Sequence, residues 1–202
     1  MRSRSCTDAP TCVNLTNHAY WHLGGEAASY DAMDHVLTIA AEQYLPVDAT
    51  RIPTGERRSV AGTAFDFREP MPISKHVRSS ADIQLTYGGG YDHNWVVDEA
   101  VAGEPRLMAY LKDPVSGRTM TLLSNQPGLQ FYSGNFFDGT TSGKAGKRYR
   151  IGDAIALEPQ MFPDALNQPS FASVVLRPGQ TYSNIIMWRF GIGRLFSPNM
   201  NR

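Results

Sequence analysis

The stretch IALEPQMFPDALNQPSF, residues 155–171, decides the fold class, because it joins a short apolar run to a turn-rich loop. Ile155, Ala156 and Leu157 are typical of the end of a buried strand. Glu158 follows them directly, so we expect a carboxylate at the rim of an apolar sheet, where desolvation can tune it for proton transfer. The alternative is a solvated glutamate at a strand end, since most glutamates are exposed. Glu158 is thus a candidate general base.

Short apolar or alternating runs recur along the chain, separated by many of its 18 Gly and 13 Pro. The candidate strands are residues 12–17, 35–41, 95–98, 106–112, 119–124, 129–133, 153–157, 173–176 and 181–190. Helical periodicity is scarce and favours a short helix over 80–85 and a turn near Asp164. Many short strands between frequent turns predict an all-β sandwich or barrel.

The connections also carry information. DPVSG at 113–117 and RPGQ at 177–180 each predict a hairpin between antiparallel neighbours. Residues 44–70 show little alternation and contain Pro46, Pro53 and Pro70, so they are expected to form a long surface excursion near a site. Within it, Asp66 and Arg68 are expected to order the loop through an ion pair.

Composition limits the class of protein. The 202 residues suit one domain, and 19 basic against 19 acidic residues leave no charge imbalance for nucleic acid or an anionic membrane. No run approaches the ~18 apolar residues of a membrane span. Cys6 and Cys12 are expected to be free thiols, and the start of the given chain lacks the apolar core of a signal peptide. A small neutral ligand fits best.

A histidine segment, VNLTNHAYWHLGG at 13–25, combines hydrogen-bonding and flat apolar side chains. His18 lies beside Asn17, Tyr20 and Trp21. Aromatic faces pack on the C–H patches of a pyranose, amides satisfy its hydroxyls, and an imidazole can pass a proton. This mixture favours a sugar site with His18 or His22 in it, and a structural histidine is the alternative.

Two further stretches supply polar candidates. GGGYDHNWVVD at 88–98 places Asp92 before a strand, where its carboxylate could accept hydroxyl hydrogen bonds or belong to an ordinary turn. In NQPGLQFYSGNFFDG at 125–139, strand periodicity points Gln130 away from Leu129 and Phe131, so Gln130 is expected to line a cleft.

Metal and serine-hydrolase chemistry are weakly supported. His18, His93, Asp92 and Glu158 are possible ligand types, but they show neither HxH nor HxxxH spacing. GxSxG is also absent from the sequence. We therefore expect no metal site.

Five of these stretches together resemble the aldose 1-epimerase (galactose mutarotase) family, from about Arg4 to Phe190. The segments that carry the resemblance are VNLTNHAYWHL (13–23), IPTGE with GTAFDF (52–56 and 62–67), GGYDHNWVV (89–97), QPGLQFYSGNFFDG (126–139) and LEPQMFPDALNQPSFASVVLRPGQTY (157–182).

The resemblance implies a galactose mutarotase-like β-sandwich, or supersandwich, that interconverts the α and β anomers of free aldoses such as glucose and galactose without a cofactor. By position, Glu158 would be the general base and His18 the general acid. Asp92, Gln130 and Asn17 would bind the substrate.

This chain also departs from the family pattern. Members are about half as long again, so we expect a single domain over 1–202 that is N-terminally truncated, lacking the family's first strands, a further histidine and a substrate-contacting arginine. Residues 191–202 are expected to form an extra C-terminal tail. Unpaired sheet edges would favour a homo-oligomer or other association. The expected location is cytoplasmic, or periplasmic or secreted if a leader precedes the chain.

Alternatives to the enzyme remain. One is a carbohydrate-binding remnant that keeps Asp92 and Gln130 without catalysis, and another is a truncated product without activity. A third is an epimerase of hexose 6-phosphates, which would need clustered cations such as Arg57, Arg58 or the basic residues of 144–150.

Overall fold

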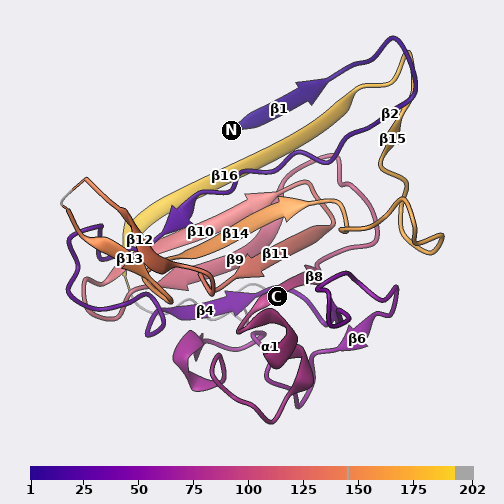
Figure 1. The fold of residues 1–202 in the computed structure, drawn as a ribbon. Coiled ribbons are helices and arrows are strands. Elements are labelled where there is room, and N and C mark those ends of the chain that lie inside the picture. Colours follow the sequence, from indigo (N-terminus) through magenta and orange to yellow (C-terminus); the bar gives the residue numbers. More distant parts are fainter. Residues whose placement is uncertain (145, 194–202) are drawn as a thin grey trace.

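The computed structural model describes residues 1–144 and 146–193, and its strands form two six-stranded antiparallel sheets that pack as a sandwich (Figure 1). The first sheet has the order β1 (Arg2–Ser5), β16 (Tyr182–Ile192), β10 (Arg118–Ser124), β9 (Arg106–Lys112), β4 (Val36–Ile39) and β7 (Met71–Pro72). The second has the order β3 (Tyr20–Trp21), β14 (Ile155–Gln160), β11 (Gly128–Tyr132), β8 (Asp92–Val96), β5 (Gln43–Leu45) and β6 (Arg58–Ser59). The predicted all-β sandwich is confirmed.

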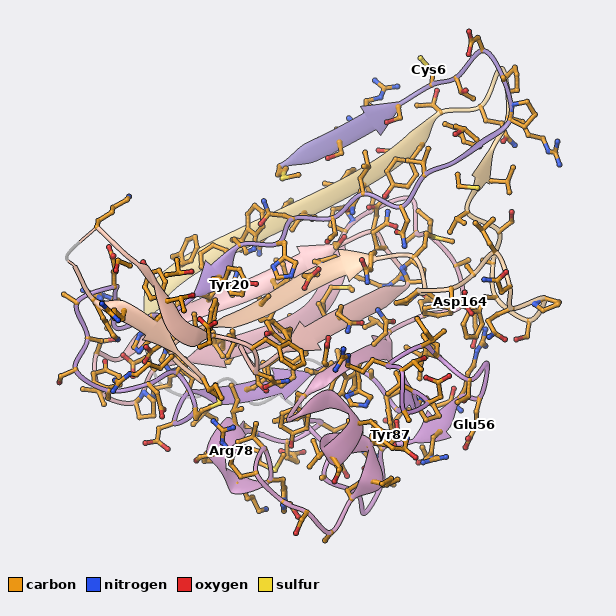
Figure 2. All side chains as sticks on the ribbon, viewed as in Figure 1. Cys6, Tyr20, Glu56, Arg78, Tyr87 and Asp164 are labelled. Carbon is orange, nitrogen blue, oxygen red and sulfur yellow. The ribbon has the colours of Figure 1, made fainter. Side chains whose placement is uncertain are left out.

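Two small sheets flank the sandwich. A hairpin of β12 (Asp138–Ser142) and β13 (Arg148–Arg150) projects from one end, and β2 (Thr11–Cys12) pairs with β15 (Val175–Leu176) at the other (Figure 1). Cys6 lies in the loop between β1 and β2 (Figure 2), and both Cys6 and Cys12 are exposed free thiols, as predicted.

The core lies between the two six-stranded sheets. Alternate residues of each strand face it, because successive side chains of a strand point to opposite faces. The second sheet contributes Tyr44, Trp95, Leu129, Phe131, Ile155 and Leu157, and the first contributes Leu37, Ile39, Leu111, Met120, Leu122 and Ile186, all at most 1% exposed. Each such side chain stabilises the fold by about 1.5–3 kcal/mol through burial. The sandwich is therefore held mainly by apolar contact between sheets.

The helical content is small. The helix α1 (Ile83–Gly88) begins after Asp82, whose side chain accepts a hydrogen bond from Gln84 N–H, and it ends at Gly89, which takes the left-handed conformation with φ 66°. The cap places the helix three residues later than the expected 80–85. A 3₁₀ turn, η1 (Ile73–Lys75), precedes it. No helix of the described residues is long and apolar enough to cross a membrane.

Residues 44–70 form the expected surface excursion only in part. Residues 48–59 are mostly exposed, but the segment begins in β5 and includes β6, and its Val60, Phe65 and Phe67 are buried in the core. The prediction missed these apolar residues because they pack between the sheets without strand alternation. The ion pair predicted within the segment is present, with Arg68 Nη2 2.7 Å from Asp66 Oδ2.

The strand expected over 12–17 is shorter in the structure. It ends at Cys12, because the backbone further along bonds to side chains: Leu15 N–H donates to the Tyr182 hydroxyl at 3.1 Å, and the Leu15 carbonyl accepts from Tyr182 and Asn184. The side chain of Asn14 also ties this segment to another loop. Asn14 Oδ1 accepts from Met161 N–H at 2.9 Å, and Asn14 Nδ2 donates to the Met161 carbonyl at 3.1 Å. The strand expected over 173–176 likewise shrinks to β15.

The hairpin at 113–117 is confirmed, because it joins β9 to its antiparallel neighbour β10. The one at 177–180 is wrong. Gln180 N–H does donate to the Arg177 carbonyl, but the turn joins β15 to β16, which belong to different sheets. Strand β1 and the β12–β13 hairpin were not expected from the sequence. Most of the predicted tail, residues 194–202, lies outside the described residues.

Replacement of a core aromatic tests how far inter-sheet packing holds the fold. Phe131→Ala is expected to lower the free energy of unfolding by about 3–5 kcal/mol, because it leaves a cavity among the buried rings of Phe67, Tyr91 and Trp95. Phe190→Ala, at a ring that is 62% exposed, is the matched control and should cost below about 1 kcal/mol. Urea unfolding measures both values, and equal losses would contradict this account of the core.

Candidate active site

The register of β14, β11 and β8 aligns polar residues on the face of the second sheet that points away from the core. Glu158 lies opposite Gln130 on β11, and Gln130 lies opposite Asn94 on β8. These residues alternate with the buried Leu129, Phe131, Ile155 and Leu157. Strand periodicity therefore places the apolar residues on one face and a row of polar residues on the other.

A second row runs beside the first. Tyr20 on β3 pairs with Ala156, Ala156 pairs with Tyr132, and Tyr132 pairs with Asp92. Tyr20 lies over the β3–β14 side of this face (Figure 2). The two rows bring together side chains from β3, β8, β11 and β14, which are far apart in the sequence.

His18 joins the site from the segment before β3. Its Nε2 lies 3.2 Å from Glu158 Oε1. The imidazole contacts the Tyr20 ring at 4.9 Å between centroids and the Tyr132 ring at 6.3 Å. The carboxylate side chain is 9% exposed and the imidazole 49%, so solvent reaches the pair from the histidine side. His18 and Glu158 thus form a close ion-pair contact between two titratable groups, open to solvent at the histidine.

Glu158 lies inside β14, not beyond the end of a strand as its sequence suggested, and it is buried. The solvated alternative is therefore wrong. Burial raises the pKa of Glu158 to about 7, with His18 acting in the opposite direction and Asp92 adding to the increase. A carboxyl group with a pKa near neutrality can both take up and release a proton under ordinary conditions.

Asp92 is joined to the first row by a hydrogen bond. Gln130 Nε2 donates to Asp92 Oδ1 at 2.8 Å. Burial raises the pKa of Asp92, while the Gln130 hydrogen bond, Arg51 and His18 lower it. Gln130 Oε1 is buried and has no hydrogen-bond partner among the described residues. Asp92 and Gln130 therefore form one unit with acceptor capacity left for a ligand. Asp92 lies in β8 itself and not in a turn before it.

Asn17 and His22, the other candidates of the histidine segment, have hydrogen-bond partners of their own. Asn17 Oδ1 accepts from Ala19 N–H, so its side chain shapes the turn after His18. His22 lies against Tyr30 and His35, with hydrogen bonds to Tyr30 and Gly24 backbone groups.

His93 is fully buried against Tyr44 and Phe65, and burial lowers its pKa to about 3. Within the described ranges, no cluster of three His, Cys, Asp or Glu residues is arranged to hold a metal ion.

Sequence reasoning missed two residues of this face. One is Tyr132, whose hydroxyl accepts from Phe136 N–H at 2.9 Å and whose ring contacts His18. Arg51 was assigned nothing, although its charge acts on Asp92. The period-two pattern from Gln130 to Tyr132 was a usable signal for the tyrosine. No local signal indicated the arginine.

Comparison with known proteins agrees with this fold. The described sheets are those of a galactose mutarotase-like β-sandwich: an aldose epimerase homologue from C. elegans superimposes with a TM-score of 0.81 at 29% identity, over 96% of this chain and 55% of that one. The family model described as aldose 1-epimerase matches residues 1–187. The chain belongs to the aldose 1-epimerase family.

Among curated relatives, galactose mutarotase from Rattus norvegicus is 43% identical over 94% of this chain and 53% of its own length. Aldose 1-epimerase from Escherichia coli K12 is 36% identical over 93% of this chain and 53% of its own length. The chain thus spans about half the length of the curated relatives it matches.

The raised pKa of Glu158 means that the folded state binds its proton more tightly than the unfolded chain does. The free energy of unfolding is therefore expected to fall as pH rises. The carboxyl titrates near 4.5 in the unfolded chain and near 7 in the folded one. Its contribution is therefore full below about pH 4.5 and is lost as pH rises through about 7. The glutamine of Glu158→Gln cannot ionise and does not lose this contribution. The free energy of unfolding of the variant, relative to that of the wild type, should therefore rise by about 1–3 kcal/mol from pH 4.5 to pH 7.

Urea unfolding at a series of pH values measures this difference. Glu104→Gln, at an exposed residue of the β8–β9 loop, is the matched control and should follow the wild type. A Glu158→Gln difference that stays constant with pH would show that Glu158 has the same pKa folded and unfolded.

Proposed function

We propose that this protein interconverts the α and β anomers of free aldoses, such as glucose and galactose, by acid/base opening and closing of the pyranose ring. The observation that carries the proposal is the 3.2 Å pair of His18 and the buried Glu158, placed beside the Asp92–Gln130 unit. Family membership supports the same reaction. The proposal concerns a chain that covers about half of its relatives.

Anomer exchange needs one group that removes a proton and another that supplies one. Glu158 as carboxylate takes the proton of the anomeric hydroxyl, the C1–O5 bond breaks, and His18 gives a proton to the ring oxygen. The product is the open-chain aldehyde. Rotation about C1–C2 exposes its other face. Ring closure then returns one proton from the acid formed on Glu158 to the new anomeric hydroxyl and one from the ring hydroxyl to His18.

The remaining polar residues hold the sugar between that pair. Asp92 and the Gln130 carbonyl oxygen accept hydrogen bonds from ring hydroxyls, and the rings of Tyr20 and Tyr132 border the same face. Asn17 is retained as a substrate-binding residue by its position next to His18, with its side-chain oxygen engaged by Ala19. Its contact with sugar stays a prediction.

The distribution of cations favours a neutral sugar over a hexose phosphate. Arg57 pairs with Glu99, and Arg58 pairs with Glu56 at 2.8 Å. Lys147 Nζ lies 3.5 Å from Asp153 Oδ1. A phosphate site needs clustered cations whose donors are available, and these candidates are spread over several carboxylates.

The wider expectations from the sequence stay predictions. They are a single domain, a cytoplasmic location, and association of copies through sheet edges. Two-residue strands at the edges, β3, β6 and β7, offer short templates for such pairing.

Polarimetry tests the reaction. Addition of the 202-residue protein to freshly dissolved α-galactose or α-glucose should speed the change in optical rotation. Glu158→Gln and His18→Gln should each lower the catalysed rate about 10²–10⁴-fold, because each removes one proton-transfer group.

Glu104→Gln and His76→Gln are the matched controls, and both should keep the wild-type rate. A wild type that gives the uncatalysed rate while sugar perturbs tryptophan fluorescence would replace the enzyme by a carbohydrate-binding module. A wild type with neither response, and without a cooperative unfolding transition, would support an inactive truncated product.

A further inference from the structure

Arg51 approaches the sugar face from the 44–70 segment, which the sequence placed near a site without indicating this residue. Its guanidinium carbon lies 5.0 Å from the centre of the Phe136 ring. Phe136 in turn stacks against Tyr132, with 6.1 Å between ring centroids and 23° between their planes. Tyr132 pairs with Asp92 across the sheet, and the charge of Arg51 acts on Asp92. The arginine is thus placed at the Asp92 end of the polar rows.

The loop that carries Arg51 is held in one shape. Asp48 Oδ1 accepts hydrogen bonds from the N–H and hydroxyl of Thr50 and from Ile52 N–H. The backbone closes the turn as well, since Arg51 N–H donates to the Asp48 carbonyl and Asp48 N–H to the Ile52 carbonyl, both at 2.9 Å. These hydrogen bonds fix the backbone of the turn, and therefore the position of the Arg51 Cα from which the side chain extends.

The base of the turn is anchored to α1. Val47 bridges to Pro53, and the buried Gln84 side chain both accepts from Val47 N–H at 2.7 Å and donates to the Val47 carbonyl at 2.9 Å. A buried amide that satisfies both backbone groups of one residue fixes that residue relative to the helix. Gln84 thus ties the Arg51 turn to the body of the protein.

The backbone of Arg51 is itself unusual. Its φ is 67°, and Asp164 is the other non-glycine residue with positive φ in the described chain. This conformation costs a non-glycine residue of order 1 kcal/mol, and glycine would adopt it without that cost. The turn alone does not require an arginine, so any contribution of this residue must come from its side chain.

The chemistry of the neighbouring residues defines that role. One N–H of Gln130 is committed to Asp92, and the groups left for a ligand are acceptors: the second oxygen of Asp92 and the buried Oε1 of Gln130. A sugar hydroxyl both donates and accepts hydrogen bonds. A guanidinium supplies the missing donors, and within the described residues Arg51 forms no ion pair that would occupy them.

We propose that Arg51 is a substrate-binding residue that, together with Asp92, holds one hydroxyl of a neutral aldose at a position away from the anomeric carbon. The hydroxyl donates to Asp92 and accepts from Arg51. The proposal rests on the proposed function for its ligand class. The Arg51 guanidinium adds a hydrogen-bond donor to the acceptors of Asp92 and Gln130. The site could then discriminate between sugars that differ at that hydroxyl.

Titration calorimetry of the 202-residue protein with galactose, glucose and each of their monodeoxy analogues tests the role. Arg51→Leu should raise the Kd for the preferred hexose about tenfold, and Arg51→Lys should restore part of the affinity. The wild type should also bind one monodeoxy sugar about tenfold more weakly than its parent, and Arg51→Leu should lose that discrimination. Arg177→Leu, in the β15–β16 turn, is the matched control and should keep the wild-type Kd.

The outcomes separate this inference from the proposed function. A wild type that speeds mutarotation while Arg51→Leu keeps its Kd and discrimination would overturn the role of Arg51 alone. A wild type that binds sugar through Arg51 without speeding mutarotation would overturn the reaction alone. Equal weakening by Arg51→Leu for every sugar, with discrimination intact, would also reject the direct contact and assign Arg51 an effect through Asp92. An NMR titration of the Asp92 carboxyl then measures that effect.

Discussion

The antiparallel pairing of β11 with β14 on one side and β8 on the other is the constraint on which the rest of the structure depends. Because successive residues of a strand face opposite ways, one register places Phe131 and Leu157 in the core and Gln130 and Glu158 on the outer face. A slip by one residue would expose the apolar row and bury the polar row. The same apolar burial that holds the sandwich thus also fixes the order of the polar groups.

That arrangement places the carboxyl group of Glu158 where little solvent reaches it. An isolated buried charge is costly, and proteins reduce the cost by neutralising the group or pairing it. Glu158 does both, through a pKa near 7 and a contact with His18. Asp92, which is half-buried, is stabilised by Gln130 and by the charges of Arg51 and His18. The surrounding fold therefore gives two similar carboxyl groups different partners.

The sequence was sufficient for the features that depend on local pattern. Short apolar runs between Gly and Pro indicated the sandwich, and period two placed Gln130 on the face opposite Leu129. It was insufficient where distant residues decide the outcome. The strand expected over 12–17 was replaced by side-chain bonds from Asn14 to Met161, 147 residues away. Arg51 depends on a turn fixed by Gln84, which contacts Val47 across 37 residues. Phe65 and Phe67 are core residues without strand periodicity.

The Asn14–Met161 hydrogen bonds have a mechanical consequence. His18 lies outside the regular strands, yet its segment is fastened to the chain that leaves β14, through Asn14 and through Thr16, whose hydroxyl donates to the Pro159 carbonyl at 2.9 Å. The proposed acid and the proposed base are therefore held in one local unit. A local opening that breaks these hydrogen bonds would displace both groups at once.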